Sequence, residues 1–115
     1  VCGFSQGGAL ALHVVLRSKL SLGACVACSS WLPLRSEYPA ALSQANKRIA
    51  VLQCHGDEDQ VVDITWGRES FNTLRGEDLG LHGNLLWKSY EGMGHSACEE
   101  ELTDVGNFLK GSICR

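Results

Sequence analysis

Short apolar segments alternate along the chain with segments of helical periodicity. The apolar segments have the length and composition of buried strands. They cover residues 1–4, 23–29, 49–54 and 84–90. Helical periodicity covers residues 6–19, 64–74 and 98–110, with a weaker helical segment at 40–46. Strands that alternate with helices predict an α/β fold with a mostly parallel sheet and helices on both of its faces.

Two of the helical segments carry a more specific prediction. The first is apolar on nearly all sides through Leu16, which predicts a helix that is buried all round. In the last segment, apolar residues at helical spacing predict a single buried face. That face is formed by Cys98, Leu102, Val105 and Leu109. The glutamates at 99–101 fall in the first turn, where the helix dipole favours negative charge.

Charge and hydropathy exclude two classes of partner. The net charge is -3, so the chain offers no basic surface for nucleic acid. No apolar run approaches the roughly 20 residues that a membrane helix needs. We therefore expect at most peripheral contact with a membrane.

The chain has six cysteines, and Cys25, Cys28 and Cys54 lie inside apolar strand segments. In such a setting cysteine acts as a small hydrophobic residue, so we expect reduced thiols in a cytosolic protein. Cys25 and Cys28 form a C-x-x-C pair, but residues three apart in a strand point to opposite faces. We therefore predict no redox or metal function for this pair.

A G-x-S-x-G motif, Gly3-Phe4-Ser5-Gln6-Gly7, stands between a predicted strand and a predicted helix. This context is typical of a nucleophile elbow, a sharp turn that lifts the serine oxygen above the sheet. Glycines are expected at positions 3 and 7 because side chains there would collide with neighbouring segments, and Gly8 extends this tolerance. The alternative is a glycine-rich turn in which the serine only caps the helix.

A serine nucleophile needs a neighbouring base, and the chain has four histidines. His13 lies in the first helix and is expected to be structural, and His82 lies in a glycine-rich loop and is expected to be solvated. His55 directly follows the strand at 49–54. His95 follows the last strand, where open α/β sheets place their sites, and it completes the chain order serine, acid, histidine. We predict His95 as the general base, with a surface loop histidine as the alternative.

The acid is expected beyond another strand end, in the segment His55-Gly56-Asp57-Glu58-Asp59. Its role is to hold the imidazole in one tautomer and to stabilise the imidazolium. Spacing does not decide among the three carboxylates, and the two aspartates fit equally well. A solvated acidic turn is the alternative for any one of them.

An apolar loop at residues 29–34 follows the second predicted strand on the same rim. We hypothesise that Trp31 and Leu32 contact an acyl chain or a hydrophobic partner surface. Plain core packing fits these residues equally well.

Four ordered segments of the chain resemble the acyl-protein thioesterases, also called lysophospholipase-like carboxylesterases. They are GFSQGGALAL, SSWLPL, LQCHGDEDQVV and KSYEGMGHSAC. The resemblance extends from Gly3 to about Leu109 and corresponds to the C-terminal portion of such a protein. It implies the α/β-hydrolase fold, with residues 1–115 as a partial catalytic domain that runs from the elbow to the last helix and lacks the first strands.

Members of this family are cytosolic serine hydrolases that remove palmitoyl groups from S-acylated proteins, and many also cleave lysophospholipids. The resemblance therefore implies these substrates and a cytoplasmic location. It also implies Ser5 as nucleophile, Asp59 as acid and His95 as base, with the amide of Gln6 as one oxyanion donor. One departure is Gln60, which stands where the family usually has proline.

The implied reaction transfers the acyl group to water through an acyl-serine and needs no metal or cofactor. The family's second oxyanion donor precedes the elbow, and nothing in this chain matches it. Loss of one donor costs about 10²- to 10³-fold in rate, so we expect the chain alone to be weak or inactive. The alternative functions are a general carboxylesterase for small esters and a non-catalytic binding protein.

Overall fold

The structure is a computed structural model that describes residues 1–113 of the chain. Its strands form one four-stranded sheet in the order β1-β2-β3-β4, and each neighbouring pair is parallel. The strands are β1 (Cys2–Phe4), β2 (Ala24–Cys28), β3 (Ala50–Gly56) and β4 (Leu85–Tyr90). The helices are α1 (Gln6–Arg17), α2 (Ile64–Arg75) and α3 (Glu99–Ser112), with short 3-10 turns η1 (Arg35–Glu37) and η2 (Gln44–Asn46). The predicted parallel α/β sheet is confirmed.

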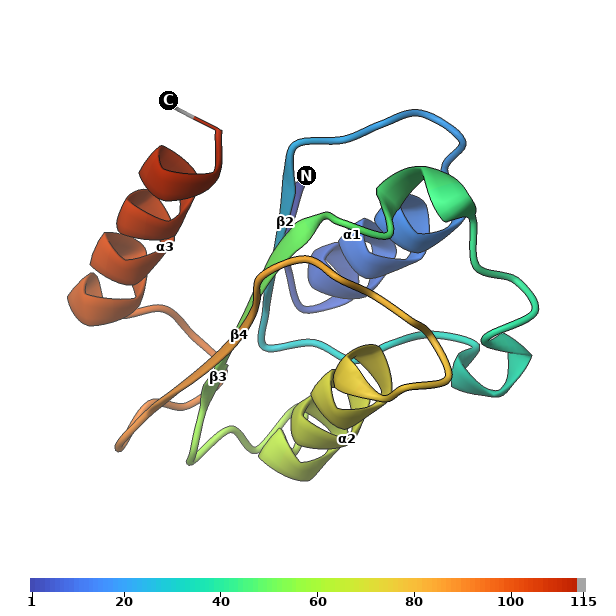
Figure 1. The fold of residues 1–115 in the computed structure, drawn as a ribbon. Coiled ribbons are helices and arrows are strands. Elements are labelled where there is room, and N and C mark those ends of the chain that lie inside the picture. Colours follow the sequence, from blue (N-terminus) through green and yellow to red (C-terminus); the bar gives the residue numbers. More distant parts are fainter. Residues whose placement is uncertain (114–115) are drawn as a thin grey trace.

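Helices cover both faces of the sheet, as the alternating pattern predicts. Figure 1 shows α1 and α2 on one side of the strands and α3 on the other. Alternate residues of each strand pack into two hydrophobic cores, one on each face of the sheet, because successive side chains point to opposite faces. Cys25 and Ala27 of β2 pack with α1 and α2, whereas Val26 packs on the α3 side.

The predicted burial of the first helix on all sides is wrong. Leu12, Val15 and Leu16 of α1 are at most 1% exposed, but Leu10 is 61% exposed and Val14 is 39% exposed. One face of α1 lies on the sheet, and its opposite face points away from it. Apolar residues can occupy every side of a helix, but a single sheet packs against only one side of that helix.

Helix α3 buries a different set of residues from the one its spacing predicts. Leu102 is 62% exposed, whereas Glu101 and Phe108 are buried. Val105, Leu109 and Cys98 are partly buried against the α3-side core, as predicted. The three glutamates do lie in the first turn of the helix.

The weak helical segment at 40–46 forms a turn followed by η2 rather than an α-helix. The side chain of its buried residue Asn46 links this segment to α1 and to the loop that follows α1. The Asn46 Nδ2 group donates to the carbonyls of Val15 at 3.0 Å and Leu20 at 2.9 Å. So short a segment gains little from helix propagation, and the tertiary bonds of Asn46 decide its shape.

Within residues 1–113, no helix combines the length and the apolar composition that crossing a membrane requires. The cysteines of that range, Cys2, Cys25, Cys28, Cys54 and Cys98, all carry free thiols. Cys114, for which a reduced thiol is also predicted, lies outside the described residues.

Candidate active site

Ser5 lies at a sharp turn between β1 and α1. Its backbone has φ 58° and ψ -121°, a positive-φ conformation that is strained for a residue with a side chain. A backbone hydrogen bond joins the turn to the end of β2, since the Ser5 N–H donates to the Cys28 carbonyl at 2.8 Å. This geometry is the elbow that the G-x-S-x-G motif predicts.

The glycines of the elbow do not share one role. A Cβ atom on Gly3 would overlap the Gly7 carbonyl, and one on Gly8 would lie 2.7 Å from Ser30 Oγ. A Cβ atom on Gly7 would meet nothing within 4 Å. The collision expected at position 7 is therefore absent, and the close approaches belong to Gly3 and Gly8.

Ser5, His95 and Asp59 meet at the carboxyl edge of the sheet. His95 Nε2 lies 3.0 Å from Ser5 Oγ, and His95 Nδ1 lies 2.8 Å from Asp59 Oδ2. The pattern suits a neutral imidazole whose Nδ1–H donates to the carboxylate while Nε2 accepts the serine hydroxyl proton. The Phe4 ring packs against the imidazole, with ring centroids 4.8 Å apart. This arrangement can activate a serine for attack on an acyl group.

The tertiary structure separates the carboxylates that spacing left equivalent. Asp59 is 8% exposed, while Asp57 and Glu58 are exposed. The Asp57 Oδ1 atom accepts the Gly92 N–H at 2.8 Å and so ties the acid loop to the loop that carries His95.

The Asp59 carboxylate is held by several donors. Its Oδ1 atom accepts the N–H groups of Val61 at 2.9 Å and Val62 at 2.8 Å. Burial by itself raises the pKa of Asp59, but the hydrogen bonds with His95, Val62 and Val61 outweigh it and hold the pKa below its ordinary value. Asp59 therefore stays ionised at neutral pH, as a partner for an imidazolium must.

His55 supports the acid loop, a role that sequence reasoning missed. It lies inside β3 rather than after it and is 1% exposed. Its Nε2 atom lies 2.8 Å from the Val62 carbonyl and 3.5 Å from Asp59 Oδ2. Helix α2 approaches closely here, since a Cβ atom on Gly67 would lie 2.5 Å from His55 Nδ1. No local sequence signal distinguishes this buried ring from a solvated one.

The first amides of α1 face the same region. Ser5 is the N-cap residue of α1, yet its side chain makes no capping hydrogen bond. The capping alternative for Ser5 is therefore wrong, and the hydroxyl is directed to His95 instead. Amides in the first turn of a helix have no partner within the helix, so the Gln6 N–H remains available to a ligand.

An open cavity of about 570 Å³ adjoins Ser5. Its walls combine the elbow with apolar side chains. These are Phe4, Trp31, Val61, Val62 and Trp66, beside Ser5, Gln6 and Gly7. Trp66 is 56% exposed and Val61 is 69% exposed, so this apolar surface is open to solvent. Sequence reasoning named Trp31 but not Val61 or Trp66, although their apolar character beside the acid loop was a usable signal.

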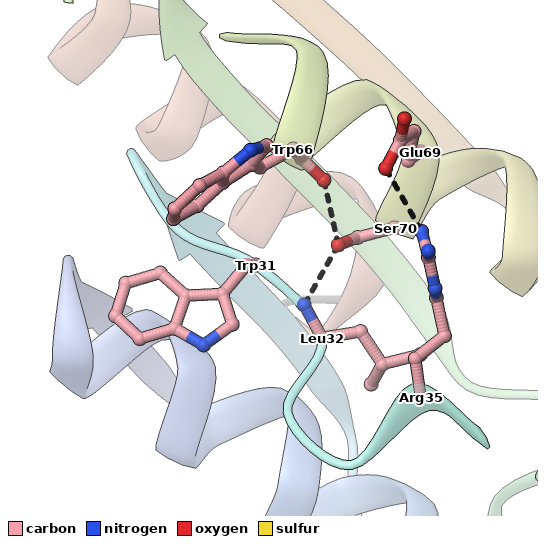
Figure 2. A pocket seen from close by; sticks show the side chains of 6 residues that line it. All are labelled: Trp31, Leu32, Arg35, Trp66, Glu69 and Ser70. Carbon is pink, nitrogen blue, oxygen red and sulfur yellow. Dashed lines mark hydrogen bonds and ion pairs between the residues drawn. The ribbon is translucent and has the colours of Figure 1, made fainter. Parts of the chain in front are cut away.

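Leu32 occupies a different position from Trp31. It is 4% exposed, belongs to the core on the α1 side and does not line the cavity at Ser5. Leu32 and Trp31 instead share a neighbouring cavity of about 280 Å³ against α2 (Figure 2). There the Ser70 hydroxyl donates to the Trp66 carbonyl at 2.8 Å and accepts the Leu32 N–H at 2.7 Å.

Comparison with known proteins identifies the family that the chain matches. Residues 1–113 match the family described as Phospholipase/Carboxylesterase. The chain is 40% identical over 113 residues to acyl-protein thioesterase 1 of Gibberella zeae, covering 96% of the chain and 46% of that protein. It is 36% identical over 112 residues to acyl-protein thioesterase 1 homolog 1 of Dictyostelium discoideum, covering 96% and 47%. The chain thus spans about half the length of the curated relatives it matches.

Two solved structures resemble the chain over nearly its whole length. Arabidopsis thaliana SOBER1 matches with a TM-score of 0.86 and 32% identity over 96% of this chain and 50% of that one. Zea mays acyl-protein thioesterase 2 matches with a TM-score of 0.83 and 30% identity over 96% and 54%.

Proposed function

The chain belongs to the phospholipase/carboxylesterase family of α/β-hydrolases, and from this premise we propose that the protein is a serine hydrolase that cleaves acyl thioesters and esters. In the proposed site Ser5 is the nucleophile, His95 the general base and Asp59 the acid that orients it. One observation carries the assignment: the continuous hydrogen-bond path from Asp59 through His95 to Ser5, with links of 2.8 and 3.0 Å.

The proposed reaction has two steps. His95 takes the hydroxyl proton as Ser5 attacks the acyl carbonyl, and the developing oxyanion forms against the Gln6 amide. His95 then gives this proton to the leaving alcohol or thiol, which restores the neutral imidazole. Water activated by His95 releases the fatty acid and restores Ser5. The ionised Asp59 stabilises the imidazolium that forms in each step.

An acyl chain is the proposed occupant of the apolar wall beside Ser5. The indoles of Trp31 and Trp66, with Val61, present a solvent-open apolar surface at the nucleophile. Burying a methylene group there is worth about 0.8 kcal/mol, so long chains are favoured over short ones. The names of the relatives support S-acylated proteins as substrates, with palmitoyl as the proposed acyl group and lysophospholipids as a second class.

The substrate proposal is tested by the chain-length dependence of kcat/KM on p-nitrophenyl esters. We expect kcat/KM to rise from acetate to octanoate, because each added methylene packs on the tryptophan wall. A preference for acetate would favour a general carboxylesterase for small esters instead.

Labelling with a fluorophosphonate probe tests the nucleophile itself, since the probe reacts only with an activated serine. We expect one label per chain and none in the Ser5→Ala variant. Ser96→Ala is the matched control, because Ser96 is exposed and adjacent to His95 yet has no part in the proposed path. Labelling that survives in Ser5→Ala, or is lost in Ser96→Ala, would contradict the assignment.

We also propose a cytoplasmic location. Free thiols on the five cysteines of residues 1–113 support it, because such thiols persist in a reducing compartment.

A further inference from the structure

Three side chains with metal-binding chemistry meet on the α3 face of the sheet, away from His95 and Asp59. Cys28 ends β2, and Cys54 of β3 is its register partner in the neighbouring strand. Glu101 reaches the same place from the first turn of α3. One Sγ atom from each cysteine and one carboxylate oxygen all lie within 4.8 Å of one another.

The C-x-x-C spacing concealed this pairing. Cys25 packs in the core on the α1 side, while Cys54 and the partly buried Cys28 belong to the core on the α3 side. The structure thus keeps Cys25 and Cys28 apart, as the strand period predicts. Parallel pairing of β2 with β3 supplies a different partner for Cys28, which no local spacing could reveal.

The Glu101 carboxyl group is buried without a counter-charge. The residue is 2% exposed, and its Oε2 atom has no hydrogen-bond partner among the described residues. No ion pair within residues 1–113 includes Glu101. Buried charges are found paired or bound to a metal, so the unpartnered carboxyl beside two thiols points to a cation.

Two sulfur ligands and one carboxylate oxygen match the preferences of Zn²⁺. Its tetrahedral sites use Zn–S bonds of about 2.3 Å, which places two sulfur ligands about 3.8 Å apart. The ligand atoms here are separated by at most 4.8 Å. A contraction of about 1 Å, within reach of small side-chain rotations, brings them to bonding geometry.

The surroundings provide access and support for a bound ion. Cys28 and Glu101 line an open cavity of about 360 Å³, whose walls include Cys2 and Phe4. The Tyr90 hydroxyl lies 3.6 Å from Cys54 Sγ and 2.8 Å from Asp104 Oδ2. Polar groups of this kind beside a ligand atom help to orient metal ligands and tune their basicity.

We propose that Cys28, Cys54 and Glu101 form a binding site for a thiophilic divalent cation, with Zn²⁺ as the ion they fit best. Coordination of the two sulfurs as thiolates releases their protons to solvent. The three ligands leave a fourth position open toward the cavity, for water or a small ligand. The site touches the elbow, because the Cys28 carbonyl accepts the Ser5 N–H at 2.8 Å.

Titration of the reduced chain with Co²⁺, a coloured substitute for Zn²⁺, tests the proposal by absorption. We expect one Co²⁺ per chain, with a thiolate-to-cobalt charge-transfer band and the intense visible bands of a tetrahedral site. One equivalent of Zn²⁺ should abolish both. Cys28→Ala and the nearly isosteric Glu101→Gln should each weaken binding more than the roughly 10- to 100-fold that loss of an outer-shell partner costs.

Two control variants test whether Co²⁺ binds at this site rather than at other cysteine or histidine side chains. Cys25→Ala removes a buried cysteine from the same strand on the opposite face, and His95→Asn removes a possible ligand at Ser5. Both should keep the wild-type cobalt spectrum. The proposal is overturned if wild type gives no thiolate band, if Glu101→Gln binds as tightly as wild type, or if either control loses the band.

Discussion

Asp57 and Asp59 are two positions apart but contact different parts of the site. The Asp59 carboxylate faces His95 at 2.8 Å, whereas Asp57 accepts the Gly92 N–H from the exposed side of the loop. The loop turns one side chain inward and the other outward. Substitution of each aspartate by asparagine therefore tests the choice between them with nearly the same change in shape.

Asp59→Asn should slow fluorophosphonate labelling of Ser5 by about 10⁴-fold, because the amide no longer holds the imidazole in the productive tautomer. The magnitude is taken from the equivalent change in the chymotrypsin-type triad. Asp57→Asn keeps an acceptor for Gly92 and should retain most of the labelling rate. Equal losses in the two variants would refute the assignment of Asp59.

Gly3 and Gly7 of the elbow differ in the space around them, and this difference is measurable as stability. Gly3→Ala should destabilise the fold by about 1–3 kcal/mol or more, because its methyl group would overlap the Gly7 carbonyl. Gly7→Ala has open space and replaces a helical glycine, so it should be neutral or stabilising by up to about 1 kcal/mol. Urea denaturation measures both, and a reversed order would contradict the elbow geometry.

At the scale of single elements, α1 shows how a helix of nearly uniform hydropathy acquires an inside and an outside. The face on the sheet buries Leu12 completely, while Leu10, two positions earlier, is 61% exposed. Composition alone cannot make that distinction, because both residues are leucine. Which leucine is buried depends on the side of the helix on which the sheet lies.

A pair of leucine truncations tests this orientation. Leu12→Ala should cost about 2–5 kcal/mol of unfolding free energy, since it opens a cavity in the core on the α1 side. Leu10→Ala, the same change on the exposed face, should stay within about 0.5 kcal/mol of the wild type. Similar losses in denaturation experiments would show that the outer face of α1 is covered.

At the scale of the whole molecule, β1 is an edge strand of the sheet that residues 1–113 form. Among the described residues β1 pairs only with β2, and Val1 and Phe4 beside it are 49% and 44% exposed. Ser5, the proposed nucleophile, directly follows this strand. The proposed oxyanion donor from residues 1–113 is the Gln6 amide, which belongs to the elbow itself.

One oxyanion donor predicts slow turnover. The 115-residue chain should hydrolyse p-nitrophenyl octanoate with a kcat about 10²- to 10³-fold below that of a full-length family member, for which the resemblance implies a second donor. Comparison with acyl-protein thioesterase 1 of Gibberella zeae under the same conditions measures the ratio. A kcat equal to that of the relative would mean that residues 1–115 contain a second donor.

Residue patterns along the chain correctly predicted the order of strands and helices, the parallel sheet and the elbow at Ser5. These features depend on residue periodicity and turn chemistry, which act over a few neighbouring positions. Chain order and strand-end position also singled out His95, but only the resemblance to a family favoured Asp59 over Asp57.

Which side chains meet across elements became visible only in the folded chain. Folding placed Asp59 inward beside His55, moved Leu32 into the core, brought Trp66 next to Trp31, and paired Cys28 with Cys54. Each of these outcomes depends on residues more than a few positions apart, or on the side from which a neighbour approaches. Local propensity does not contain that information, because it arises only when separate elements pack into one core.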